Sequence, residues 1–106
     1  MSELRIAFDA MPWQEIRDGV RHKVYCEGTR QLRLVEFGQC QGEEWWGEHG
    51  HIGYVLAGSL DINFDGTVKS FIAGDGLFIP PGTATRHRGM NIAPGTRLLM
   101  VEDTQA

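Results

Sequence analysis

The sequence has no long apolar run and few cysteines, and these absences exclude membrane-spanning and disulfide-rich classes. No stretch of its 106 residues approaches the roughly 18 consecutive apolar residues of a membrane helix. Residues 1–4 have neither the basic nor the apolar region of a secretion signal. Cys26 and Cys40 form no CxxC pair, so we interpret them as buried thiols, with thiolate metal ligation as the alternative. We expect a cytoplasmic protein without a membrane partner.

Runs of basic residues are also absent. Fourteen acidic residues outnumber ten basic ones, for a formal charge of −4, and the basic residues are scattered along the chain. We therefore expect no nucleic-acid partner, because such a partner requires a concentrated basic surface. Arg86, His87 and Arg88 form a local cluster, which indicates either attraction of an anionic ligand or a solvated strand with outward charges.

Helical periodicity is the third missing feature. Apolar residues nowhere recur with a period of about 3.6 along the chain, whereas 14 glycines and 4 prolines separate short β-branched and aromatic runs. The chain is therefore predicted to be all-β and to form a single domain, either a sandwich or a barrel. The expected strands cover residues 4–8, 20–26, 32–37, 51–56, 60–64, 68–72, 77–79, 85–90 and 96–101, and residues 13–17 are a candidate helical turn. Asp65-Gly66 is expected to form a tight hairpin turn, because both residues tolerate a positive φ.

Two segments resemble the conserved motifs of the cupin superfamily. Residues 54–60 are similar to the end of the first motif, G-x5-H-x-H-x3,4-E-x6-G, whose last glycine corresponds to Gly58. Residues 74–82 are similar to the second motif, G-x5-P-x-G-x2-H, with Gly74, Pro80 and Gly82 on its first three fixed positions. The resemblance covers roughly residues 32–101 and implies a double-stranded β-helix, the jelly-roll barrel of cupins.

The resemblance also implies a division of the chain and an oligomeric state. Residues 20–103 correspond to the cupin barrel, and residues 1–19 to an N-terminal strand and its connection. Cupins commonly pair through such a strand, and the alternating edge strand at residues 4–8 needs a cover. We therefore expect a homodimer in which this strand pairs with the partner's sheet.

Most metal ligands of the family motif are missing here. His51 stands where the family places its ligand glutamate. The two ligand histidines would fall on Trp45 and Gly47, or on Glu44 and Trp46 if the gap is one residue longer, and the last histidine would fall on Thr85. A metal would therefore need a shifted set of ligands.

Four residues form that candidate shifted site: His51, His87, His49 and Glu44. Strand alternation places His49 and His51 on one face, and His87 approaches from a facing strand if His51 points into the barrel. Imidazole and carboxylate ligands suit a divalent transition metal such as Zn, Fe, Ni, Mn or Cu. The alternative is that no metal binds, that the histidines hydrogen-bond to each other or to a buried carboxylate, and that His49 lies in an exposed loop. His22 is read as a satisfied core or interface histidine.

Trp45, Trp46 and Thr85 are candidates for the wall of a substrate pocket, because two large aromatic residues occupy the loop where the family carries its ligands. Core or dimer packing is the alternative for the tryptophans. The sequence has no nucleophile elbow, zinc-protease helix or phosphate-binding loop, which excludes those hydrolase and nucleotide-binding classes.

Three functions remain open. The first is a small cupin that binds a small molecule in its barrel through a divalent metal at the shifted histidine site. By resemblance, such a metal site also supports an enzyme, namely a dioxygenase, isomerase or lyase acting on a small organic substrate. The second is a metal-free binding or sensing module, and the third is a homodimeric scaffold, which is compatible with either of the others.

Overall fold

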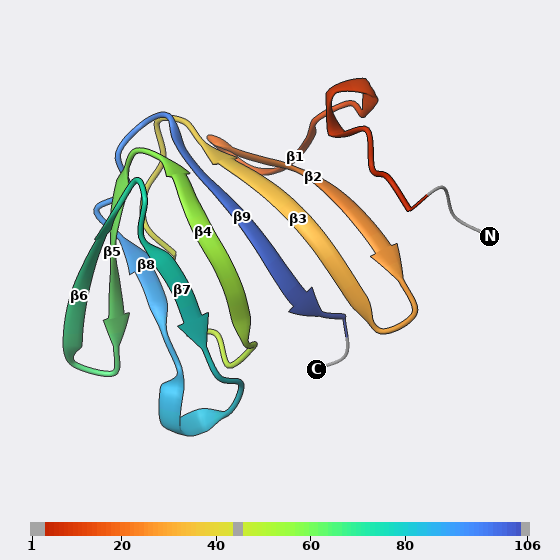
Figure 1. Cartoon of the computed structure of the whole chain (residues 1–106). Coiled ribbons are helices and arrows are strands. Elements are labelled where there is room, and N and C mark those ends of the chain that lie inside the picture. Colours follow the sequence, from red (N-terminus) through yellow and green to blue (C-terminus); the bar gives the residue numbers. More distant parts are fainter. Residues whose placement is uncertain (1–3, 44–45, 105–106) are drawn as a thin grey trace.

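The chain forms two antiparallel β-sheets that face each other across a common interior (Figure 1). The computed structural model describes residues 4–43 and 46–104. Its elements are η1 (Phe8–Ala10), β1 (Gln14–Arg17), β2 (Val20–Glu27), β3 (Arg30–Phe37), β4 (His51–Ala57), β5 (Ser59–Phe64), β6 (Thr67–Ile72), β7 (Gly76–Ile79), η2 (Thr83–Thr85), β8 (Arg88–Met90) and β9 (Thr96–Asp103). No helix in the described part of the chain is long and apolar enough to cross a membrane.

The large sheet has the strand order β1-β2-β3-β9-β4-β7, and the small sheet has the order β6-β5-β8. Alternation along the strands directs every second residue inward, so that Val35, Val55 and Leu98 of the large sheet are buried opposite Leu60 and Ile62 of the small one. This arrangement confirms the predicted all-β, single-domain barrel of the jelly-roll type.

The hairpin predicted at Asp65-Gly66 is present between β5 and β6. Phe64 pairs with Thr67 across a two-residue loop, and Asp65 and Gly66 have φ values of 52° and 106°. The Asn63 side chain accepts a hydrogen bond from the Gly66 amide at 2.7 Å. Aspartate and glycine tolerate the positive φ that such tight hairpin turns require.

Gly58 shows why a motif glycine is needed between β4 and β5. Its φ is +82°, and a Cβ built there would lie 2.3 Å from the Thr96 Oγ1. Thr96 is fully buried. Its hydroxyl group accepts a hydrogen bond from the Ser59 amide and lies within hydrogen-bond distance of the Ser59 and Ala93 carbonyls, which share its one O–H donor. A side chain at position 58 would therefore displace the hydroxyl group that joins these segments.

The expected strand at residues 4–8 is wrong, and so is the helical turn at residues 13–17. Leu4 has a φ of 63°, the 3-10 turn η1 begins at Phe8, and the strand of this segment is β1, which pairs with β2. The buried Lys23 donates from Nζ to the Phe8 carbonyl at 2.7 Å and lies 4.7 Å from the Trp13 ring centroid. These contacts hold the N-terminal segment on the outer face of its own sheet, beside β2 (Figure 1).

The two thiols are free, and the expectation that both are buried is wrong for one of them. Cys26 is exposed near the end of β2, whereas Cys40 is half-buried and packs against the core. The Cys26 Sγ donates a hydrogen bond to the Gln31 side-chain oxygen.

Candidate functional site

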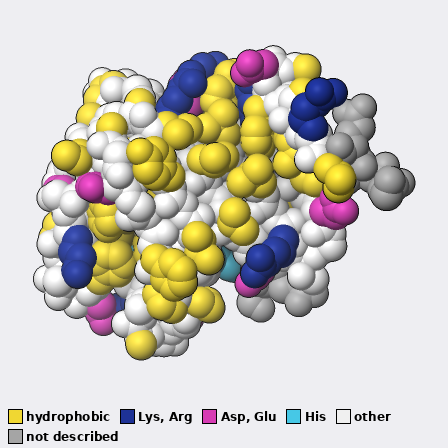
Figure 2. Space-filling view, in the orientation of Figure 1, with side chains coloured by type: hydrophobic (Ala, Val, Ile, Leu, Met, Phe, Trp, Pro, Cys, Tyr) yellow, Lys and Arg dark blue, Asp and Glu magenta, His cyan; other side chains and the backbone are white. Residues whose placement is uncertain are grey.

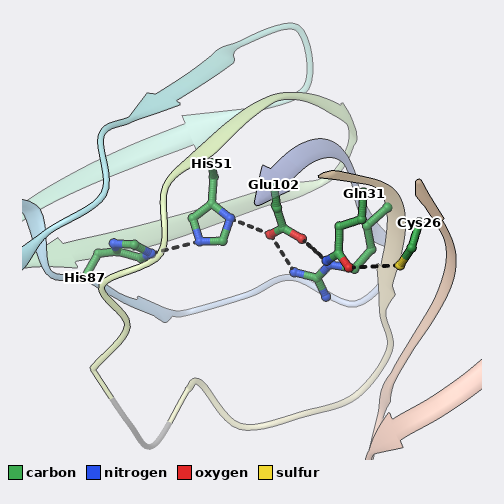
Figure 3. A network of polar contacts seen from close by, with 6 residues as sticks. Cys26, Gln31, His51, His87 and Glu102 are labelled. Carbon is green, nitrogen blue, oxygen red and sulfur yellow. Dashed lines mark hydrogen bonds and ion pairs between the residues drawn. The ribbon is translucent and has the colours of Figure 1, made fainter. Parts of the chain in front are cut away.

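His51 and His87 meet inside one end of the barrel. His51 is the first residue of β4, and His87 precedes β8 and pairs through its backbone with Gly47. Their Nε2 atoms are 3.0 Å apart, and their rings are nearly perpendicular, at 74° (Figure 3). The structure thus brings together the two histidines on which the sequence-based metal hypothesis chiefly rests.

The Glu102 carboxylate, on β9, fixes the orientation of His51. Glu102 is 6% exposed, and its Oε2 lies 2.5 Å from the His51 Nδ1. The same carboxylate accepts two hydrogen bonds from Arg33 and one from Gln31. Burial alone raises the pKa of Glu102, but the hydrogen bonds from His51 and Arg33, the charge of Arg33 and the Gln31 amide outweigh it and hold the pKa far below its ordinary range. The ionised carboxylate only accepts, so the His51 Nδ1 donates.

A backbone carbonyl plays the corresponding role for His87. The His87 Nδ1 lies 3.0 Å from the Thr85 carbonyl oxygen, which accepts but never donates a hydrogen bond. His87 is 6% exposed. Burial lowers the pKa of His87 and outweighs the opposing hydrogen bond to Thr85. His87 is therefore neutral near pH 7, with its proton on Nδ1.

When both rings are neutral, these assignments leave both Nε2 atoms without a proton. A neutral imidazole carries one N–H and one lone pair, and each ring has its N–H at Nδ1. Two lone pairs then face each other across 3.0 Å, an arrangement that is repulsive unless a cation lies between them. The 3.0 Å separation fits one shared proton directly. A metal ion, about 2.0–2.1 Å from each nitrogen, would have to lie to one side of the line that joins them.

Two hollows lie against the histidine pair. The interior cavity has a volume of about 120 Å³, and both histidines line it together with Arg33, Glu43 and the aliphatic core. The mouth, of about 390 Å³, is lined by His22, His49, His51 and His87, among others. The pair therefore stands where a bound molecule would pass from solvent to the interior.

The other residues predicted for the site do not join the histidine pair. His49 is exposed at the mouth. The Trp46 ring is stacked by the guanidinium groups of Arg86 and Arg88, at 4.8 and 4.9 Å, and is not among the residues lining either hollow. Glu44 and Trp45 lie outside the described residues.

Thr85 contributes its backbone rather than its side chain. The strand predicted from residue 85 begins only at Arg88, because residues 83–85 form η2. The Thr85 Oγ1 donates to the Pro80 carbonyl, and Thr85 lines a separate surface hollow with Phe64, Phe71 and Phe78, among others. What Thr85 supplies near the pair is the carbonyl that orients His87.

Sequence reasoning missed three charged residues of this site. Glu102 and Arg33 occupy inward positions of β9 and β3, so a charge continuing an apolar alternation was the signal for both. Glu43 accepts a hydrogen bond from the Gly89 amide and lines both hollows, a placement that no local pattern indicates. His22, expected to be satisfied, has a buried Nδ1 without a hydrogen-bond partner among the described residues.

The donor set fits a metal in chemistry but offers only two imidazoles. Unprotonated Nε2 atoms are ligands for Zn, Fe, Ni and Cu, and the Nδ1 contacts with a carboxylate and a carbonyl are the outer partners that metal-bound histidines usually have. No group of three His, Cys, Asp or Glu side chains converges within residues 4–43 and 46–104. Solvent or a bound molecule would complete the coordination.

Comparisons with known proteins identify solved structures that are similar to this chain in fold. No family model matches the chain, and no curated protein matches it. Among solved structures, an RmlC-like cupin from Shewanella frigidimarina is 22% identical over 98% of this chain and 93% of its own, with a TM-score of 0.78. KdgF from Halomonas sp. is 20% identical, over 92% and 90%, with a TM-score of 0.75. The polyketide cyclase RemF from Streptomyces resistomycificus is 21% identical, over 99% and 81%, with a TM-score of 0.74.

Proposed function

We propose that this chain, which belongs to the cupin superfamily by its fold, binds a small molecule in its barrel through a divalent transition metal held by His51 and His87. The observation that carries the proposal is the pair of facing Nε2 atoms, 3.0 Å apart. Glu102 and the Thr85 carbonyl hold both rings in the tautomer that presents these lone pairs.

A metal satisfies the pair better than a shared proton does. Burial disfavours a charged imidazole at His87, whereas a metal ion forms coordinate bonds with both nitrogens. When bound, the metal would supply a Lewis-acidic point that attracts an oxygen atom of the ligand. Glu102 would keep the His51 Nε2 free to bind, and Arg33 would balance the Glu102 charge.

The small molecule follows from the coordination and from the two hollows. Two protein nitrogens leave several coordination positions for other atoms, and the interior cavity and the mouth both reach the histidines. RemF, named as a polyketide cyclase, supports the alternative that a barrel of this fold carries out a reaction, here a metal-dependent one such as that of a dioxygenase, isomerase or lyase.

Metal-free binding is the second candidate function. It is favoured by the finding that only pairs, and no larger group of metal-binding side chains, converge in the described part of the chain. In that case His51 and His87 would share a proton, and the barrel would hold its ligand by shape and hydrogen bonds.

Metal titration separates the two candidates. Untagged protein treated with a chelator would be titrated with Co²⁺, and both visible absorption and thermal stability would be recorded. We expect one ion per chain, ligand-field absorption typical of nitrogen ligation, and a higher unfolding temperature, because an ion bound only to the native state stabilises it. Absence of all three changes would refute the metal proposal in favour of metal-free binding.

We also propose a homodimer, formed through the outer face of the large sheet. Ile52, Tyr54 and Leu56 of β4 and Phe78 of β7 are 48%, 49%, 47% and 78% exposed, and apolar side chains spread over this face in Figure 2. Together the four expose on the order of 400 Å² of mostly apolar surface, about half of what one partner buries in a standard interface.

The charges on this face are compatible with the binding of a second copy of the chain. Two ion pairs, Arg97–Glu36 and Arg30–Asp103, lie at opposite ends of the central strands β3 and β9. Each of these two ion pairs is neutral overall, so neither of them repels a second copy that approaches this face. The N-terminal segment stays on its own sheet in this arrangement.

A further inference from the structure

The β6 strand forms one edge of the small sheet and borders an apolar hollow (Figure 1). We propose that this edge binds an extended peptide segment of a partner protein, which adds a strand to the sheet. The segment carries an acidic residue opposite Lys69 and an apolar residue two positions away from it. This inference is independent of the metal, because β6 contributes no residue to the two hollows beside the histidine pair.

Two residues of β6 present backbone groups that have no partner. A two-residue loop joins β5 to β6, and the pair that closes such a loop exchanges both of its hydrogen bonds. Hydrogen-bonded and open pairs alternate along an antiparallel ladder, so Val68, Ser70 and Ile72 direct their N–H and C=O groups away from β5. Asp75 caps these groups at Ile72, whereas no described residue binds the outward groups of Val68 or Ser70. These groups are a template for an added strand.

The hollow beside this edge receives apolar side chains. It holds about 400 Å³ between β6 and the end of β7, and Phe64, Phe71, Ile79 and Pro80 are among the residues that line it. Lys69 and Phe71 lie on the same side of β6, because side chains alternate along a strand. A strand added to β6 directs every second side chain to that side as well. Side chains opposite Lys69 and Phe71 therefore face the hollow.

Lys69 determines the charge of the partner segment. Among the described residues that line the hollow, Lys69 alone is charged, and it forms no ion pair with a described residue. An inward-facing charge disfavours pairing of an edge strand with an arbitrary apolar strand. It also disfavours a second copy of this chain, because antiparallel pairing of Val68 with Ser70 would place the two Lys69 side chains opposite each other. A carboxylate opposite Lys69 removes both penalties and selects an acidic segment.

An NMR titration with a short peptide tests the location. The probe is acetyl-Thr-Leu-Thr-Glu-Thr-Leu-Thr-amide, which has leucine two positions from the glutamate in both directions and therefore fits a parallel or an antiparallel addition. Isotope-labelled protein would be titrated with this peptide. We expect the largest amide shifts at Val68 and Ser70, because their N–H groups gain hydrogen bonds. Absence of binding at millimolar peptide, or shifts confined to other strands, would overturn the proposed site.

Charge exchange tests the acidic residue. The wild type should bind the glutamate peptide at least about threefold more tightly than the same peptide with a central lysine, because a cross-strand pair of opposite charges replaces a pair of like charges. Lys69→Glu should reverse this preference. Arg30→Glu makes the same change of charge at the exposed first residue of β3 and should leave the preference unchanged. Equal binding of both peptides by the wild type, or the same preference in Lys69→Glu, would overturn the role of Lys69.

A proline peptide separates strand addition from attraction by charge alone. Proline in place of the two threonines beside the glutamate keeps the charge but removes the N–H donors that face β6. We expect this peptide to bind at least about fivefold less tightly, because two hydrogen bonds are lost. Equal affinity for the proline peptide would overturn strand addition.

Two neighbouring exposed residues provide a matched pair of variants for the hollow. Ala84→Phe fills the hollow, whereas Thr83→Phe adds an aromatic ring at the adjacent position, which does not line it. Both residues are exposed, so both variants should fold. We expect Ala84→Phe to weaken binding of the glutamate peptide at least about threefold, through loss of the space for one leucine, and Thr83→Phe to leave it unchanged. Equal affinities of the two variants would overturn the part given to the hollow.

Discussion

Arg33 on β3 donates two hydrogen bonds to the Glu102 carboxylate on β9, from Nε to Oε1 at 2.8 Å and from Nη2 to Oε2 at 2.9 Å. The two residues sit on adjacent strands in a diagonal relationship, because Arg33 pairs with Met100 and Glu102 pairs with Gln31. A carboxylate held in this way stays ionised while buried. It therefore orients His51 without taking up the imidazole proton.

Glu102→Gln is expected to lower both stability and Co²⁺ affinity. The substitution leaves Arg33 partly buried without its counter-charge, which costs about 3–5 kcal/mol for a buried pair, and it weakens the partner that orients His51, which costs roughly 10- to 100-fold in affinity. Urea unfolding and Co²⁺ titration measure the two effects. The control, Asp103→Asn, breaks an exposed ion pair with Arg30 and is expected to cost at most about 1 kcal/mol. Equal losses in the two variants would contradict the role given to Glu102.

Stability is expected to fall in acid through the same carboxylate. The pKa of Glu102 in the folded chain is far below its ordinary value of 4.5, so the unfolded chain binds a proton first as the pH falls. The stabilisation is complete above the unfolded pKa and is lost progressively below it. As the pH is lowered from about 7 to about 3, the urea concentration at the midpoint of unfolding should decrease for the wild type. It should decrease less steeply for Glu102→Gln. Parallel curves for the two proteins would show that this carboxylate is not the group concerned.

Gly58→Ala is expected to destabilise the barrel far more than Gly28→Ala. Both glycines have positive φ, 82° and 62°, but a Cβ at position 58 would meet the Thr96 Oγ1 at 2.3 Å whereas one at position 28 meets nothing within 4 Å. The strained backbone alone costs about 1–2 kcal/mol, and at Gly58 displacement of the buried hydroxyl group adds to it. Thermal unfolding measures the loss of stability in each of the two variants. Similar losses would contradict the explanation that a Cβ at position 58 lies too close to Thr96.

The proposed homodimer predicts that one charge on the outer face disrupts association. Phe78→Asp should convert a dimer into a monomer at micromolar concentration, because it buries an unpaired carboxylate in the apolar centre of the interface. Val68→Asp, on β6 of the small sheet and 49% exposed, should leave the dimer intact. Light scattering measures both. A monomeric wild type, or two variants that behave alike, would refute this interface.

Local pattern predicted most of the fold. The Asp65-Gly66 turn and the strands at residues 32–37 and 96–101 depend on neighbours in sequence, and these expectations agree with the structure. The N-terminal segment did not follow its pattern, because the alternation of Leu4, Ile6 and Phe8 does not reveal that a distant lysine, Lys23, binds the Phe8 carbonyl.

The site depends on longer-range relationships, and the sequence resolved it only in part. The motif position of His51 and the alternation near His87 were sufficient to suggest that these two residues meet. Glu102 escaped notice because its partners, Arg33 and His51, are 69 and 51 residues away. Thr85 was assigned through its side chain, whereas only the folded 3-10 turn shows that its carbonyl orients His87.

The most direct test of the account compares Co²⁺ binding by the wild type, His87→Gln and His49→Gln under identical conditions. The wild type and His49→Gln should bind one ion per chain with the same visible absorption, because His49 lies at the exposed mouth. His87→Gln should lose more than the roughly 10- to 100-fold in affinity that loss of an outer partner costs. Equal Co²⁺ binding by all three proteins would contradict the claim that His51 and His87 hold a metal between them.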